Sequence, residues 1–203
     1  MSTPLRGTWR LCVTTGDARP RYEAAYALAF CGLRAAEILG LAWADLDEGR
    51  TVATIRYQLA GSGPKATRVQ LKTAASEQPV PLPPFVTSRL IAHHAEQLRE
   101  RFAAGVPTEE SLVFVTPRGL PVSHSWLTQH FQDLLKAADL PKMRLHDLRH
   151  GAATLLLGAG VHPRVAQQLL RHASSKTTTE IYSHVTAAQE RQAAEVLEAA
   201  LAG

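Results

Sequence analysis

Residues Arg144 to Val185 read RLHDLRHGAATLLLGAGVHPRVAQQLLRHASSKTTTEIYSHV, and this stretch decides how the rest of the chain is interpreted. It places His146 and Arg149 three residues apart, and His172 and Tyr182 follow. Residues at i and i+3 share one face of a helix, so the first two side chains can reach a common ligand. Cations neutralise phosphoryl oxygens, and a phenol oxygen can attack the phosphorus. The stretch therefore points to chemistry on a phosphate ester.

Taken singly, these residues are weak signals. An isolated His-x-x-Arg pair is far more often a surface histidine beside a solvated arginine, and a lone tyrosine on a helix is more often half-buried packing. Tyr182 has Ile181 directly before it, and neighbours on a helix point about 100° apart. Ile181 can therefore anchor the helix in the core while Tyr182 points out of it.

The composition is that of an ordinary globular protein, with 203 residues, 45% hydrophobic and 20% charged. The formal net charge of +4 is compatible with nucleic-acid binding, although many basic proteins bind none. No apolar run approaches the roughly 20 residues that span a bilayer, and the first residues lack the apolar region of a signal peptide. We therefore expect a cytoplasmic protein without membrane contact.

The cysteines and histidines show no metal-ligand spacing. We expect Cys12 and Cys31 to be small buried thiols without a disulfide. No HExxH or comparable spacing occurs, so no metal is expected, and His93, His94 and His124 are interpreted as surface residues.

The hydrophobic pattern predicts an α+β domain that is mostly helical. Helices are expected at residues 21–31, 33–39, 85–104, 123–138, 146–158, 163–171, 177–184 and 187–202. Ser123 is the predicted N-cap of its helix. Residues 51–58, 67–72 and 78–82 are predicted to form a small three-stranded antiparallel sheet.

Four segments resemble, in the same order, the C-terminal catalytic domain of the tyrosine recombinases, the phage integrase family. LHDLRH and LLRHASSKTTTEIYSHV resemble its C-terminal signature. CGLRAAEILGLAWADLD resembles the segment with its first catalytic arginine, which would be Arg34, and LKTAASEQPVPLP resembles the hairpin segment with its catalytic lysine, which would be Lys72. The resemblance covers about residues 21 to 190.

The resemblance implies a mechanism in which Tyr182 is the nucleophile. It would attack a DNA phosphate to give a 3′-phosphotyrosyl bond and a free 5′-hydroxyl. Arg34 and Arg149 would clamp the non-bridging oxygens, because a guanidinium stays charged and bonds bidentately. His172 would donate a further hydrogen bond to the same phosphate.

The remaining roles concern protons and positioning. Lys72 would be the general acid that protonates the leaving 5′-oxygen, and His146 would serve as base or as orienting partner of the tyrosine proton. Glu37, three residues after Arg34, either holds that arginine in place or forms an ordinary exposed pair. The scheme needs no cofactor and no metal.

Two further cations are predicted to contact DNA. Arg171 stands where the family usually has glycine before its second histidine, and it adds positive charge beside the scissile phosphate. Lys176 follows in the polar turn after His172.

The resemblance also implies a domain organisation. Residues 1–20 are expected to be an arm or the remnant of a linker, residues 21–203 to be the catalytic domain, and the family's N-terminal core-binding domain to be absent. DNA binding should then be weak and strongly salt-dependent. The partners implied are double-stranded DNA and further copies of the chain, as a monomer alone and a tetramer on DNA, in a bacterial or phage-derived protein associated with the nucleoid.

Alternatives remain at this point. One is a type IB topoisomerase-like relaxase, which shares the Tyr, Arg and Lys chemistry, and another is a non-catalytic DNA-binding fragment. The apolar residues of the last predicted helix, Ala194, Val196, Leu197 and Leu201, suit docking on a neighbouring protomer and packing on their own domain equally well.

Overall fold

The computed structural model describes residues 20–61, 65–71, 79–105, 112–170 and 187–201. The helices are α2 (Pro20–Phe30), α3 (Ala35–Gly40), α4 (Pro84–Ala104), α5 (His124–Ala137), α6 (Asp147–Gly158), α7 (Pro163–Leu169) and α8 (Ala187–Leu201), with a 3₁₀ turn η1 (Trp43–Asp45). The strands are β1 (Val52–Thr54), β2 (Tyr57–Ala60), β3 (Thr67–Gln70) and β4 (Pro79–Pro81). The predicted class, a mostly helical α+β fold, is confirmed.

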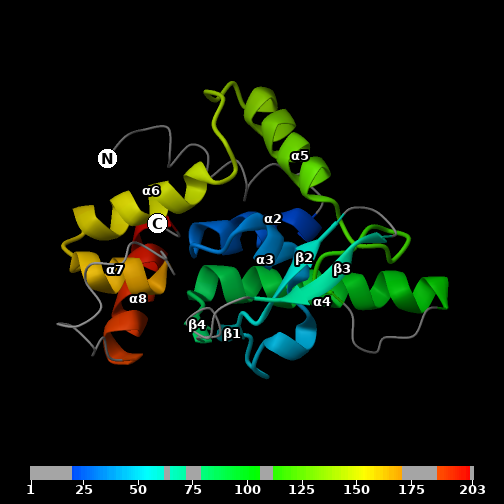
Figure 1. The fold of residues 1–203 in the computed structure, drawn as a ribbon, viewed down its shortest axis with the longest axis horizontal. Helices are drawn as coiled ribbons and strands as arrows, with labels where there is room; N and C mark the ends of the chain where they lie inside the picture. Colours follow the sequence, from blue (N-terminus) through cyan, green and yellow to red (C-terminus); the bar gives the residue numbers. More distant parts are fainter. Residues whose placement is uncertain (1–19, 62–64, 72–78, 106–111, 171–186, 202–203) are drawn as a thin grey trace.

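Helix α2 forms the centre of the core. Ala24, Ala27, Leu28 and Phe30 are fully buried, and every residue from Ala24 to Phe30 belongs to the hydrophobic core. A helix that is apolar on all sides must be covered on all sides. Accordingly α2 lies between α6 and α4, with α3 beside it (Figure 1).

The strands differ from the prediction of one three-stranded sheet, since the described residues form two separate two-stranded antiparallel ladders. β1 pairs with β4, with Ala53 opposite Val80, and β2 pairs with β3, with Tyr57 opposite Gln70. Residues 51–58 were expected to be one strand, but Ile55 turns into the core between β1 and β2. Strand β2 then passes so close to α3 that a Cβ on Gly40 would lie 2.6 Å from the Gln58 carbonyl carbon.

The predicted helix ends are largely confirmed by their caps. The hydroxyl of Ser123 accepts a hydrogen bond from the N–H of Trp126 at the start of α5. Pro84 occupies the first turn of α4, where a missing N–H costs nothing, and Gly105 ends that helix in the left-handed conformation with φ 64°. The helix predicted at residues 177–184 lies outside the described residues.

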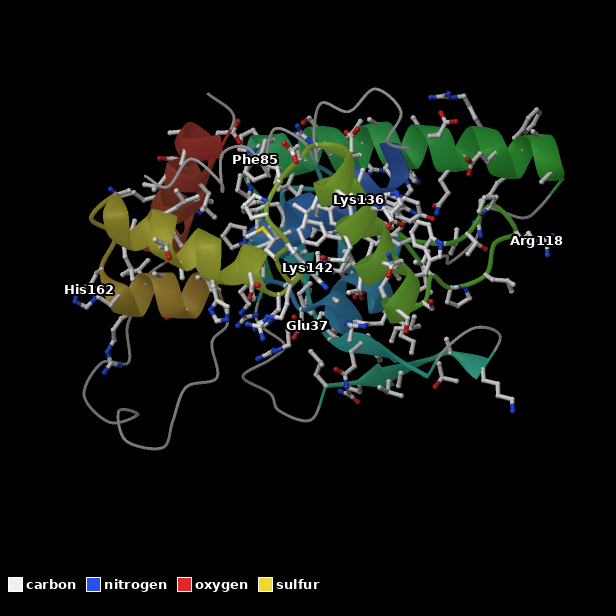
Figure 2. The ribbon with its side chains drawn as sticks, turned by 90° about the horizontal axis from the view of Figure 1, so that it is seen from above. Glu37, Phe85, Arg118, Lys136, Lys142 and His162 are labelled. Carbon is white, nitrogen blue, oxygen red and sulfur yellow. The ribbon has the colours of Figure 1, made fainter. Side chains whose placement is uncertain are left out.

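Helix α8 packs on its own domain. Ala193, Ala194 and Leu197 are buried, and α8 contacts α6, α7 and β4. The carboxylate of Glu198 accepts the backbone N–H of Phe85 at 2.8 Å, which joins α8 to the start of α4 (Figure 2). Of the two alternatives for the apolar residues of the last helix, packing on the chain's own domain therefore holds for this face of α8.

The prediction for His93 is wrong, whereas the prediction for Cys31 is confirmed. His93 is buried rather than exposed: its Nε2 hydrogen-bonds with the carbonyl oxygen of Val113 at 2.6 Å, and its ring stacks on Phe114. The buried thiol at Cys31 is confirmed, and burial raises its pKa far above the ordinary value. Cys12 lies outside the described residues.

None of the described helices has the length and apolar character to cross a bilayer.

Candidate functional site

Arg34 stands at the start of α3, where a buried carboxylate holds it. The backbone N–H and the guanidinium of Arg34 both donate to Glu37, at 2.9 Å each. The Glu37 side chain is 1% exposed, whereas that of Arg34 is 44% exposed. Burial makes the Glu37 carboxylate a fixed acceptor, so the guanidinium is aimed while part of it stays open to solvent. Figure 2 shows Glu37 between α6 and the β2–β3 hairpin.

Arg149 reaches the same turn of the chain from α6. Its side chain is buried, and its guanidinium donates to the carbonyl oxygen of Gly32. Gly32 has φ +87°, and a Cβ there would lie 2.7 Å from the Cα of Leu170 at the end of α7. Only glycine allows this conformation and this close approach. The turn between α2 and α3 is therefore fixed by contacts from both α6 and α7.

His146 precedes α6 and is exposed at its N-terminus. Its ring lies edge-on to that of His150, with centroids 5.0 Å apart. Partial burial lowers the pKa of His146, and the positive charges of His150, Arg149 and Arg34 lower it further. His146 is thus held toward its neutral form, in which an imidazole can accept a proton. His146 lies near the segment that carries Arg34, since Leu33, Ala35 and His146 line the same cavity.

A cavity of about 280 Å³ adjoins His146. Its walls come from α2, α3, α5 and the turn before α6: Ala29, Leu33, Ala35, His124, Thr128, Arg144, Leu145 and His146. Arg144 is tied to Asp147, whose carboxylate accepts both its guanidinium and its backbone N–H. The cavity therefore has mainly apolar walls, with His146 and the guanidinium of Arg144 at the end beside α6.

The β2–β3 hairpin is anchored beside α3 by Arg68, a residue that the sequence reasoning missed. Its guanidinium donates to the Gly40 carbonyl oxygen at 2.8 Å, pairs with the carboxylate of Asp45, and lies over the ring of Tyr57. The hairpin continues through Leu71, whose N–H donates to the carbonyl oxygen of Arg56. Nothing local in TRVQLK indicated this role, because all the partners of Arg68 come from other segments.

The structure thus brings together Arg34, His146 and Arg149, three of the predicted site residues. The other five, Lys72, Arg171, His172, Lys176 and Tyr182, lie outside the described residues. The structure does describe the residues that directly precede two of them. The residue before Lys72 is the hairpin residue Leu71, and the residue before Arg171 is Leu170, which packs on Gly32.

Chemically, the three described residues suit the binding of an anion. Two guanidinium groups supply planar arrays of N–H donors, and a neutral imidazole beside them can move a proton. In the described part of the chain no three His, Cys, Asp or Glu side chains gather as a metal site would require. The arrangement suits a tetrahedral phosphoryl group, whose oxygens gain negative charge as it reacts.

Comparison with known proteins points in the same direction. The sequence model of the phage integrase family matches residues 15–189. A XerC-like tyrosine recombinase of Caldanaerobacter subterraneus subsp. tengcongensis is 31% identical over 191 residues, covering 87% of this chain and 49% of that protein. The integrase of Mycobacterium phage FRAT1 is 31% identical over 187 residues, covering 91% of this chain and 54% of that protein. The chain spans about half the length of these curated relatives.

Solved structures support the fold. The Tn1549 transposon integrase in complex with transposon right end DNA matches with a TM-score of 0.69 at 21% identity, covering 100% of this chain and 66% of that one. The XerA recombinase matches with a TM-score of 0.61 at 25% identity, covering 95% and 61%.

Proposed function

Since the chain belongs to the phage integrase family of tyrosine recombinases, we propose that it is the catalytic domain of a site-specific DNA recombinase. It cuts and rejoins DNA strands through a 3′-phosphotyrosyl intermediate. The observation that carries this proposal is the convergence of Arg34 with His146 and Arg149 at the turn around Gly32. Arg34 comes from the first half of the chain and the other two residues from the second half, so they belong to separate motifs of the family.

The proposed reaction begins with Tyr182. Its phenol oxygen attacks the phosphorus, its proton passes to His146 or to water, and the bond to the 5′-oxygen breaks. A free tyrosine has a pKa near 10, so the surrounding cations must lower the cost of forming the phenolate. The lowered pKa of His146 supports its part as the proton acceptor. Rejoining reverses these steps with a 5′-hydroxyl as nucleophile, so no nucleotide cofactor is consumed.

Arg34 and Arg149 bind the non-bridging oxygens, and His172 adds a third donor. Because Glu37 and the Gly32 carbonyl hold the two guanidiniums before substrate arrives, little reorganisation is needed as charge develops. Lys72 donates a proton to the departing 5′-oxygen. The anchoring of the β2–β3 hairpin by Arg68 supports this role, since it fixes the strand that leads to Lys72.

The proposed partner is double-stranded DNA, contacted also by Arg171 and Lys176. Residues 21–203 act as the catalytic domain, preceded by residues 1–20 as an arm, and copies of the chain assemble as a tetramer on DNA while the free chain is a monomer. The relative solved with transposon DNA supports DNA as the substrate class.

The test is capture of the covalent intermediate. The protein is incubated with a pool of duplexes that carry a nick beside a randomised core, so that the short fragment with the free 5′-hydroxyl diffuses away and the adduct cannot reverse. A protein–DNA adduct is then sought on a denaturing gel, and the attached DNA is sequenced. We expect an adduct with the wild-type chain and with Tyr57→Phe, and none with Tyr182→Phe.

The outcomes separate the alternatives. DNA binding without an adduct on any substrate would identify a non-catalytic DNA-binding fragment. Relaxation of supercoiled plasmid by a monomer, with adducts of no preferred sequence, would identify a topoisomerase-like enzyme. Adducts enriched in one sequence support the recombinase.

A further inference from the structure

Helix α4 has two apolar faces, and only one of them faces the core. Val86, Leu90, His93 and Gln97 are buried against the rest of the domain. Ile91, Ala95, Leu98 and Phe102 recur at spacings of four, three and four residues, so they align on the roughly opposite side. We call these four residues the outer stripe. Their spacing is the one by which a helix presents a seam to a second helix.

The outer stripe is open to solvent. The exposed fractions are 49% for Ile91, 38% for Leu98 and 88% for Phe102, and Ala95 is exposed as well. At 1.5 Å per residue the stripe runs for about 16 Å, or three helical turns. Scattered single apolar residues on a surface need no explanation, whereas a continuous stripe with an almost fully exposed phenylalanine is a candidate interaction surface.

The flanks of the stripe are basic. On a helical projection Arg99 and Arg101 lie about 80° to either side of it. His94 lies on the Arg101 side and hydrogen-bonds with the guanidinium of Arg50, which adds a further positive charge there. Glu96 pairs with Arg99, but it projects farther from the stripe, and an exposed pair of this kind is weak.

We propose that the outer stripe docks an amphipathic helix of a partner protein whose flanking positions are acidic. The apolar seam supplies the contact area, and the flanking arginines select the charge of the partner. A second copy of this chain is disfavoured, because pairing two stripes would bring Arg99 and Arg101 against the same residues of the other copy.

The position of the stripe leaves the proposed DNA site free. Helix α2 lies between α4 and α6, so the stripe is on the far side of α4 from Arg149. In Figure 2 α4 runs along the upper edge, away from Glu37. A partner bound to the stripe can therefore be present while DNA is held, and this inference does not depend on the proposed catalytic function.

The test uses two labelled synthetic peptides of about four heptads, long enough to form a helix. Both carry leucine at the seam positions, and they differ only in having glutamate or lysine at the flanking positions. Like charges keep each peptide from pairing with itself. Fluorescence anisotropy with the 203-residue chain should show saturable binding of the acidic peptide and none of the basic one.

Variants locate the binding. Leu98→Ser and Phe102→Ser should each weaken binding by about tenfold or more. The double change of Arg99 and Arg101 to glutamate should transfer the preference to the basic peptide. Leu157→Ser, at a leucine on α6 that is 49% exposed against 38% for Leu98, is the matched control and should bind as the wild type does. Thermal unfolding confirms that each variant is folded.

The proposal is overturned if neither peptide binds, if both bind equally, or if Leu157→Ser weakens binding as much as Leu98→Ser. It is also overturned if sedimentation shows self-association of the chain that Leu98→Ser abolishes, because the occupant of the stripe would then be a second copy.

Discussion

At the scale of single residues, burial decides how much an arginine–carboxylate pair at the start of a helix contributes to stability. In two places an arginine and the acid three residues later form the same arrangement, in which the carboxylate accepts both the backbone N–H and the guanidinium. The Glu37 side chain is 1% exposed and that of Asp147 is 27% exposed. Charge-assisted hydrogen bonds are worth more where water does not compete for the same groups.

The first prediction compares these two pairs. Glu37→Gln should lower the free energy of unfolding by about 2 kcal/mol, because a buried charged acceptor of two donors is lost. The matched Asp147→Asn should cost about 1 kcal/mol or less, because water replaces the exposed contact. Urea unfolding measures both, and equal losses would contradict the importance of burial.

The second prediction concerns the pH response of His146. Its pKa lies below the ordinary value of 6.5 because of burial and the positive neighbours, first among them His150. Nuclear magnetic resonance titration should give a midpoint below 6.5 that rises in His150→Gln. A folded-state pKa below the unfolded one means that neutral His146 contributes stability above pH 6.5, and that this contribution is lost as pH falls through the lowered pKa. An unchanged midpoint in His150→Gln would contradict the coupling.

The third prediction concerns Arg149. Arg149→Lys keeps the positive charge but loses the planar array that bonds the Gly32 carbonyl and that we propose to bind the phosphate. The single-turnover rate of adduct formation should fall by about a hundredfold, the usual cost of one preorganised donor. Arg118→Lys, at an exposed arginine on the far edge of the domain (Figure 2), should change the rate little. A large loss in the control alone would place the phosphate elsewhere.

At the scale of elements, the hairpin and the last helix owe their positions to contacts far along the chain. Arg68 ties the β2–β3 hairpin to α3 through Gly40 and Asp45. Helix α8 closes the domain through Leu197 and through the Glu198 bond to Phe85 at the start of α4. Both elements are short, so their own hydrogen bonds cannot hold them in place alone.

The fourth prediction tests the docking of α8. Leu197→Ala should lower the free energy of unfolding by about 3 kcal/mol, because it leaves a cavity against α6 and α7. Glu195→Ala on the exposed side of the same helix should change it by less than about 0.5 kcal/mol. If Leu197→Ala were equally harmless, α8 would not be held on its own domain in solution.

At the scale of the whole molecule, the chain has a formal net charge of +4, and in its described part Arg34 and Arg149 form a cluster near the turn at Gly32. The cluster lies on the opposite side of α2 from α4, whose outer stripe has its own basic flanks. The net charge alone does not identify a partner. The positions of the charged residues, however, separate a proposed phosphate site from a proposed protein-docking face.

The fifth prediction concerns salt. Binding of the chain to a short DNA duplex should weaken linearly on a log–log plot against salt, with a slope of about −0.9 for each phosphate neutralised. Arg34→Ala should reduce the magnitude of that slope by about one, while Arg99→Ala on the far side should leave it unchanged. Equal slopes for wild type and Arg34→Ala would contradict a phosphate contact at Arg34. A reduced slope in Arg99→Ala would instead place DNA on the α4 face.

The sequence alone determined the class of fold and the helix cap at Ser123, and it supplied the predicted site residues. These depend on local features: Ser123 caps its own helix, α2 is apolar on every side, and each motif is a short stretch. The placement of Lys72, His172 and Tyr182 stays a prediction from those motifs. Only the tertiary structure decided that residues 51–58 divide between two ladders, that His93 is buried, and that α8 packs on its own domain. The physical reason is that contacts between distant segments, such as the bond from Arg149 to the Gly32 carbonyl, leave no periodic pattern in the segments they join.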